Sequence, residues 1–174
     1  MAFTVEPEIV YPEQRLQQVI SHEIQECCRH EISLGSLLEY FTLESFGLDI
    51  AVFLRFPNGR SASRFFELKS FGGQRAGGVG FGNQHGEGRE VDLLLLDEQE
   101  LGLADESIRW ILADGFVSVG GNRYAIFNNH QARDAAMGGV RRRKQNNLRV
   151  DQLMLHAVTW QALSDEIRRF LTQG

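Results

Sequence analysis

Two strands and one tight turn are expected within residues 46–71, FGLDIAVFLRFPNGRSASRFFELKSF. Branched and aromatic residues dominate residues 46–56, a composition typical of a β-strand. Pro57-Asn58-Gly59 then interrupts the apolar run. Proline suits the second position of a type I turn, asparagine suits the third, and glycine suits the left-handed position that follows. The sequence therefore predicts a β-hairpin with a three-residue loop.

The loop also predicts how the two strands pair. It places Phe56 opposite Arg60, and counting back along both strands places Asp49 directly opposite Glu67. Lys69 lies two residues further on, so it points to the same face of the sheet. Carboxylates placed opposite each other raise each other's proton affinity unless a cation lies between them. The three residues therefore predict a site for a hard ion such as Mg²⁺, which can activate water and offset the charge on a phosphate.

This interpretation depends on the register of the hairpin. A shift by one residue would place Asp49 on the other face of the sheet. A Glu-x-Lys triplet by itself occurs in many proteins as the polar face of an exposed strand, and this is the alternative for Glu67 and Lys69.

The arrangement resembles the PD-(D/E)XK nuclease superfamily, which includes many restriction enzymes and DNA-repair nucleases. Leu48-Asp49 matches the first part of the family motif and Glu67-Leu68-Lys69 the second, although the proline before the aspartate is missing. The resemblance covers roughly residues 13–71. The fold it implies is a restriction-endonuclease-like α/β (α+β) core, a mixed β-sheet with an N-terminal helix and a C-terminal helix. The resemblance also implies that Asp49 and Glu67 bind Mg²⁺ (or Mn²⁺), that Lys69 generates or orients the attacking water, and that the substrate is DNA.

A helix is predicted before the hairpin. Pro12 suits its first position, Glu13 favours the positive end of its dipole, and an apolar stripe recurs at helical spacing: Leu16, Val19, Ile20, Ile24, Cys27 and Cys28. Glu23 falls within this stripe, where a glutamate needs a partner. Because the family commonly has a further acid on this helix, the resemblance makes Glu23 a candidate metal ligand, with Glu31 and Glu39 as rivals. A glutamate at the stripe edge that reaches water is the alternative.

Two further segments predict contacts with nucleic acid. Residues 141–149 carry a run of basic side chains, which suits an arm that tracks phosphates: Arg141, Arg142, Arg143, Lys144 and Arg149. Residues 72–88 are rich in glycine and offer candidate contacts to phosphates or base edges: Arg75, Asn83, Gln84 and His85. The alternative for the basic run is a solvated surface loop. The alternative for residues 72–88 is a disordered loop without a role. The net charge of −5 argues against nucleic-acid binding, but the distribution of charge matters more than its sum.

Length and composition predict a single α/β domain over residues 1–174. No apolar run approaches the length of about 18 residues that a membrane span needs, and the N-terminus lacks a signal-peptide pattern. Cys27 and Cys28 are adjacent on the predicted helix, where they are poorly placed to bridge each other and suit core packing in a reducing cytoplasm.

The remaining elements are predicted more coarsely. Strands are expected at residues 108–112, 123–127 and 153–158, and residues 116–122 suggest a second hairpin. Thr159 is expected to cap a final helix with one apolar face: Leu163, Ile167, Phe170 and Leu171.

Three functions are consistent with these features. The first is a Mg²⁺-dependent endodeoxyribonuclease. The second is a non-catalytic nucleic-acid-binding module, or a dimerising module that forms a homodimer, on the same fold. The third is a small-molecule-binding α/β domain in which the charges of the hairpin are only surface decoration. The chain is also similar in look to proteins of mobile bacterial gene cassettes, a likeness that carries no chemistry. Metal-dependent DNA cleavage separates the first from the others, and a steep salt dependence of DNA binding separates the second from the third.

Overall fold

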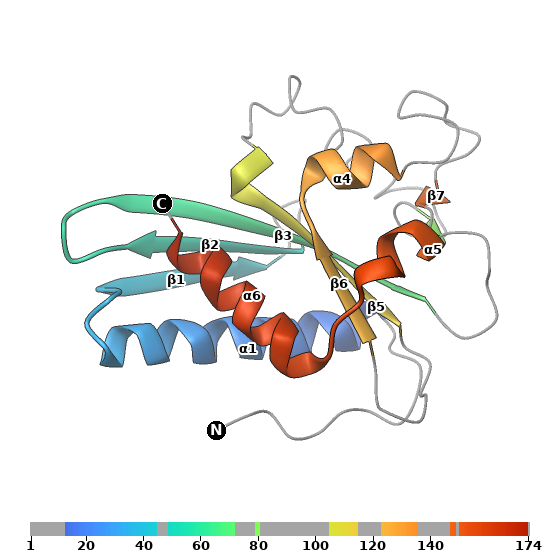
Figure 1. Cartoon of the computed structure of the whole chain (residues 1–174). Coiled ribbons are helices and arrows are strands. Elements are labelled where there is room, and N and C mark those ends of the chain that lie inside the picture. Colours follow the sequence, from blue (N-terminus) through green and yellow to red (C-terminus); the bar gives the residue numbers. More distant parts are fainter. Residues whose placement is uncertain are drawn as a thin grey trace.

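A five-stranded mixed β-sheet lies at the centre of the computed structural model (Figure 1), in the order β1-β2-β3-β5-β6. The structure describes residues 13–44, 49–71, 79–80, 105–114, 123–135, 147–148 and 150–173. The strands β1 (Glu39–Glu44), β2 (Ile50–Arg55) and β3 (Ser61–Phe71) form an antiparallel meander. The strand β5 (Ile108–Asp114) pairs parallel with β3, and β6 (Arg123–Phe127) pairs antiparallel with β5. The predicted mixed sheet is therefore confirmed.

Two long helices, α1 (Glu13–Ser33) and α6 (Trp160–Thr172), pack against each other and against one face of the sheet (Figure 1). The predicted apolar stripes of both helices are buried in this core. From the sheet, Ile50 and Val52 of β2 and Phe66 and Leu68 of β3 contact the same core. This side of the sheet is called the α1/α6 face below. Because side chains alternate along a strand, the odd-numbered residues of β2 and β3 point to the opposite face.

The opposite face is called the α4 face, because the short helix α4 (Asn129–Asp134) packs there against β5. Trp110 of β5 is fully buried, and its Nε1–H donates a hydrogen bond of 3.0 Å to the side-chain oxygen of the buried Asn129. A reciprocal capping box begins the helix. The backbone N–H of Asn128 donates to Oε1 of Gln131 (2.9 Å), and the backbone N–H of Gln131 donates to Oδ1 of Asn128 (2.8 Å).

The remaining described elements are short. They comprise the 3₁₀ helices η1 (Asp105–Ser107) and η2 (Met154–His156), the helix α5 (Val150–Leu153), and a two-stranded sheet of β4 (Val79–Gly80) and β7 (Asn147–Leu148). Among the described residues, no helix is both long enough and apolar enough to cross a membrane.

The predicted hairpin between β2 and β3 is confirmed. The backbone N–H of Phe56 donates to the carbonyl of Arg60 (2.8 Å), and the backbone N–H of Gly59 donates to the carbonyl of Phe56 (3.0 Å). Gly59 has a φ of 87°, the left-handed conformation that the turn requires. Asn58 supports the turn by accepting a hydrogen bond from the backbone N–H of Arg60 (3.0 Å).

The strand predicted at residues 153–158 is wrong. The chain there leaves α5 and enters η2, and only Val158 forms a β-bridge, with Tyr124. The backbone N–H of Ala157 bonds locally to the carbonyl of Met154 (3.1 Å), and the side chain of Leu155 is 73% exposed. The run is apolar but has no sheet face to bury it, so a local turn forms instead.

Other predictions need smaller corrections. The first strand of the hairpin was predicted from residue 46, but β2 begins at Ile50, and residues 45–48 lie outside the described residues. Residues 116–122, where a second hairpin was predicted, also lie outside them. Thr159 does occupy the N-cap position of α6, but its side chain makes no capping hydrogen bond. Neither β1 nor α4 was predicted from the sequence.

Candidate active site

The register of the hairpin brings Asp49 beside the Glu-x-Lys triplet. Ile50 pairs with Phe66, so the predicted pairing is confirmed, and Asp49 lies one residue before β2 at the level of Glu67. One side-chain oxygen of Asp49, Oδ2, accepts a hydrogen bond of 2.7 Å from the backbone N–H of Leu68. Asp49 therefore lies against the segment that carries Glu67 and Lys69.

Glu67 and Lys69 form a buried ion pair on the α4 face. The distance between Lys69 Nζ and Glu67 Oε1 is 3.3 Å, and the two side chains are only 3% and 6% exposed. On the neighbouring strand β5, Trp110 lies beside Glu67 and Leu112 lies beside Lys69. The pair is buried beside these two large side chains, and a buried charge that loses its partner is costly. The alternative in which the triplet is the polar face of an exposed strand is therefore wrong.

Gln17 of the helix α1 forms a hydrogen bond with the backbone of Asp49. Its side-chain amide donates a hydrogen bond of 3.1 Å to the carbonyl oxygen of Asp49. This contact joins the first helix to the start of β2 and limits where the Asp49 carboxylate can lie. Gln17 was not predictable from the sequence, because the contact joins residues far apart in the chain and has no local signal.

Glu23 does lie on the core side of α1, but its partners come from the helices. One carboxylate oxygen, Oε1, accepts hydrogen bonds from the hydroxyl of Ser164 on α6 and from the thiol of Cys27 (3.7 Å). The packing of α6 onto α1 brings Ser164 to the buried Glu23, and the serine hydroxyl satisfies the carboxylate. The sequence carries no signal for this contact. Alternation along β3 directs Glu67 to the α4 face, so the structure does not bring Glu23 and Glu67 together.

The two rival acids have other surroundings. Glu31 lies near the end of α1, where its Oε1 is 3.8 Å from Nε of Arg168 on α6. Glu39 does not lie on a helix, because it begins β1 and forms an exposed ion pair of 2.9 Å with Arg55. Neither acid lies beside the Asp49–Glu67 pair in the register of the sheet.

The two cysteines are free thiols in the core between α1 and α6. Burial raises the pKa of both Cys27 and Cys28 to about 12, because removing water disfavours the charged thiolate. At neutral pH both side chains are therefore uncharged and suited to packing.

The donor set suits a magnesium ion held by few protein ligands. Within the described ranges, no group of three or more histidine, cysteine, aspartate or glutamate side chains is arranged to hold a metal. Asp49 and Glu67 form a set of two carboxylates. Mg²⁺ is commonly bound by one or two carboxylates, with the remaining positions filled by water and substrate phosphate. A magnesium ion held by these two carboxylates therefore stays a prediction.

All of the predicted nucleic-acid contacts lie outside the described residues: Arg75, Asn83, Gln84, His85, Arg141, Arg142, Arg143, Lys144 and Arg149. Each of the two segments nevertheless contributes one described strand. Val79 pairs with Leu148 and Gly80 pairs with Asn147, so β4 and β7 join the glycine-rich segment to the basic one. The strand β4 also lies near β3, which carries Glu67 and Lys69.

An aromatic row, Phe41–Phe53–Phe65, crosses three strands on the α4 face. Phe41 and Phe53 are cross-strand partners whose ring centroids lie 6.1 Å apart, and Phe65 meets Phe53 edge-on at 6.5 Å. Phe41 is 59% exposed and Phe53 is 37% exposed. Phe65 and Glu67 are two residues apart on β3 and so share a face. The row was missed in the sequence analysis, since only the pairing of β1 with β2 aligns the rings.

The candidate active site therefore combines one carboxylate at the start of β2, a buried glutamate–lysine pair near the end of β3, and an aromatic row on the same face. Comparison of the chain with family models, with curated proteins and with solved structures finds no significant match.

Proposed function

We propose that the chain is a Mg²⁺- or Mn²⁺-dependent endodeoxyribonuclease of the PD-(D/E)XK type, with a restriction-endonuclease-like core. The observation that carries the proposal is the register of the hairpin, which sets Asp49 beside Glu67 and leaves Lys69 Nζ 3.3 Å from the Glu67 carboxylate. Two carboxylates can hold a catalytic metal, and a neighbouring amine can orient water or offset the charge on a phosphate, which suits metal-assisted phosphodiester hydrolysis.

Each residue has a distinct part in the proposed reaction. Asp49 and Glu67 supply the oxygen ligands for the ion, which, when bound, lowers the pKa of a water and offsets the charge that develops on the phosphate. The hydrogen bond from the Leu68 N–H holds one oxygen of Asp49 in place. Lys69 is held by Glu67 and orients the attacking water or neutralises the phosphate. Gln17 is a positioning residue, since its side chain forms a hydrogen bond to the backbone carbonyl of Asp49 and not to the carboxylate.

The aromatic row supports a nucleic acid as the substrate. Phe41 and Phe53 offer exposed rings on the same face as Glu67, and bases that are not paired stack on such rings without regard to sequence. The pairing of β4 with β7 adds support, because it joins the two segments from which contacts to phosphates are expected.

Asp49→Asn tests the metal site. The amide keeps an oxygen that can accept from the Leu68 N–H, so the fold should persist, while the loss of one negative charge weakens the hold on the ion. We expect the wild-type protein to cut DNA with Mg²⁺ or Mn²⁺ and to be inert in EDTA, and Asp49→Asn to cut at least about a hundredfold more slowly. The measurement is the initial rate of cleavage of labelled single-stranded and double-stranded DNA.

The matched control is Asp165→Asn, the same change at an exposed position on α6. Its cleavage rate should equal that of the wild-type protein. Equal rates in the two variants, or cleavage that continues in EDTA, would rule out the proposed site. Absence of cleavage on all substrates with both metals would favour a non-catalytic binding module instead.

Phe41→Ala tests the aromatic row separately from the chemistry. Loss of one stacking ring is expected to weaken the binding of single-stranded DNA about tenfold, since base stacking contributes about 1–3 kcal/mol. Fluorescence polarisation in EDTA measures this without cleavage. Leu155→Ala, which removes an exposed apolar side chain from η2, is the control and should bind as the wild-type protein does. If Phe41→Ala leaves DNA binding unchanged but converts a dimer to a monomer in sedimentation, the row is instead a homodimer surface.

A further inference from the structure

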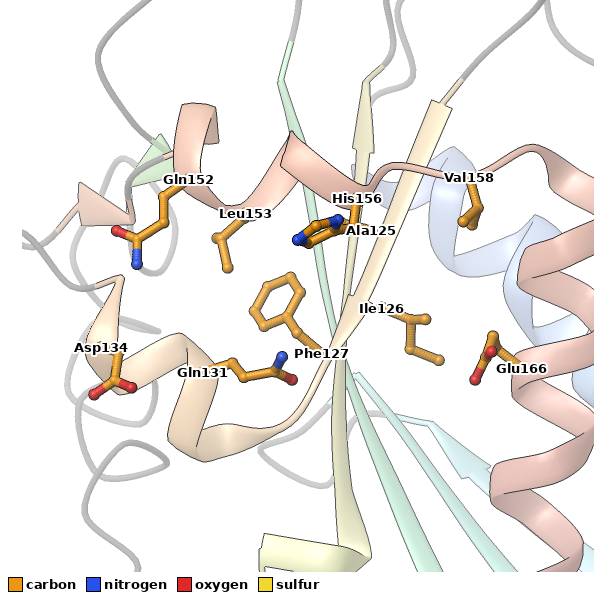
Figure 2. Close-up of a pocket in the computed structure, with 10 residues that line it drawn as sticks. All are labelled: Ala125, Ile126, Phe127, Gln131, Asp134, Gln152, Leu153, His156, Val158 and Glu166. Carbon is orange, nitrogen blue, oxygen red and sulfur yellow. The ribbon is translucent and has the colours of Figure 1, made fainter.

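A cavity of about 360 Å³ lies along the outer edge of β6, the last strand of the sheet (Figure 2). Tyr124 of β6 exchanges backbone hydrogen bonds with Val158 at one end of this edge (3.0 and 2.8 Å). Ile126 lies two residues further along and lines the cavity. In an antiparallel strand, residues two apart direct their backbone N–H and C=O to the same side. The edge therefore presents one backbone donor and one backbone acceptor towards the cavity.

The larger cavity combines an aromatic ring with amide side chains. Figure 2 shows the ring of Phe127 between Gln131 on one side and Leu153 and His156 on the other, with Gln152 further along the same wall. The capping box of α4 occupies Oε1 of Gln131 and so fixes this side chain, whose amide nitrogen remains a donor. The ring of Phe127 stacks on Trp110 and is only 4% exposed, so it offers the cavity a firm apolar floor beside the fixed Gln131 amide. Such a floor beside an amide suits a planar heterocycle that carries polar edges.

A smaller cavity of about 210 Å³ adjoins the first one. The two share Ile126, Phe127, Gln131 and Glu166, so they meet along β6. The smaller cavity adds two arginines, Arg109 and Arg169. Arg109 stacks over the ring of Phe170 at 4.5 Å, which holds its guanidinium in place. Two guanidinium groups that line one cavity are suited to binding a phosphate.

Glu166 lies where the two cavities meet. Its carboxylate forms an ion pair of 2.9 Å with Arg169, and both side chains are substantially exposed. An exposed pair of this kind contributes little to stability, so Arg169 can turn to an anion at small cost. The carboxylate then becomes an acceptor for hydroxyl groups, the role that acidic residues have beside a ribose.

We propose that the two cavities form one binding site for a nucleoside 5′-monophosphate. The base lies in the larger cavity against Phe127 and the edge of β6, the ribose lies beside Glu166, and the phosphate lies against Arg109 and Arg169. Asp49, Glu67 and Lys69 line neither cavity, so the site is separate from the proposed nuclease site. The inference therefore goes beyond the proposed function, and its test does not depend on DNA cleavage.

Calorimetric titration of the full chain with AMP, adenosine and inorganic phosphate tests the site. AMP is expected to bind about tenfold more tightly than adenosine, because only AMP gains charge-assisted hydrogen bonds from the arginines. Arg169→Gln should weaken AMP binding about tenfold and leave adenosine binding unchanged. Gln152→Ala should weaken both ligands by a similar factor, because the amide contacts the base.

The matched control is Arg29→Gln on α1. Arg29, like Arg169, is an exposed helical arginine paired with a glutamate three residues away, so the two changes alter net charge equally. Melting temperatures of all variants establish that each is folded. Equal affinity for AMP and adenosine, equal AMP affinities of Arg169→Gln and Arg29→Gln, or AMP titrations that show no saturable binding would each overturn the proposal.

Discussion

Removal of either charge of the buried Glu67–Lys69 pair is expected to lower the free energy of unfolding by about 3–5 kcal/mol. The reason is that Glu67→Gln takes away the carboxylate 3.3 Å from a buried ammonium, while Lys69→Met takes away the ammonium and leaves the carboxylate. The double variant buries no charge at these positions, so it should regain most of the lost stability. Urea denaturation of the four proteins measures both effects.

The exposed pair Glu39–Arg55 is the control for this cycle. Its atoms are closer, at 2.9 Å, but its side chains are 60% and 53% exposed, so water screens the charges. Glu39→Gln and Arg55→Met should each change stability by less than about 1 kcal/mol. The coupling energy of each pair is measured with its two single variants and its double variant. A coupling energy for Glu67–Lys69 as small as that for Glu39–Arg55 would contradict the expected stabilisation by the buried pair.

The same double variant separates catalysis from folding. Glu67→Gln with Lys69→Met should fold and should have lost DNA cleavage, because it retains neither the second carboxylate nor the amine. Loss of activity in a single variant would be ambiguous, since instability alone can cause it. A folded double variant that cuts DNA at the wild-type rate would remove both residues from the mechanism.

Arg64→Met is expected to lower the free energy of unfolding by about 2–4 kcal/mol. Arg64 is 8% exposed, and its guanidinium donates to two carbonyls at the end of α6, those of Phe170 (3.0 Å) and Gln173 (2.6 Å). Burial lowers the pKa of Arg64, but the carbonyls at the negative end of the helix dipole stabilise its charge. Thermal and urea denaturation measure the loss.

Arg64→Lys and Arg55→Met make this prediction specific. Lysine keeps the charge but lacks the planar fork that reaches two carbonyls at once, so it should restore only part of the stability. Arg55 lies on the same hairpin but is exposed, and its replacement should cost less than about 1 kcal/mol. If Arg64→Met were no more destabilising than Arg55→Met, the contact with the end of α6 would have no role in folding.

Much of the candidate site was predictable because its geometry is local. Pro57-Asn58-Gly59 specifies one turn, that turn specifies one register, and the register places Asp49 beside Glu67. The position of Glu23 was less predictable. Helical spacing placed it correctly on the buried side of α1, but its partner is Ser164, which is 141 residues away. No spacing within α1 carries information about which residue of α6 will face it.

The sequence by itself determined the elements whose signals are short in range. These are the hairpin, the apolar stripes of α1 and α6, and the strands β5 and β6, because turn chemistry and side-chain periodicity act over a few residues. Only the tertiary structure decided that Glu67 and Lys69 are buried, that Gln17 holds the backbone of Asp49, and that Phe41 aligns with Phe53. Each of these depends on which distant elements pack together. Burial and contact between such elements are set by the whole core, and no local pattern encodes them.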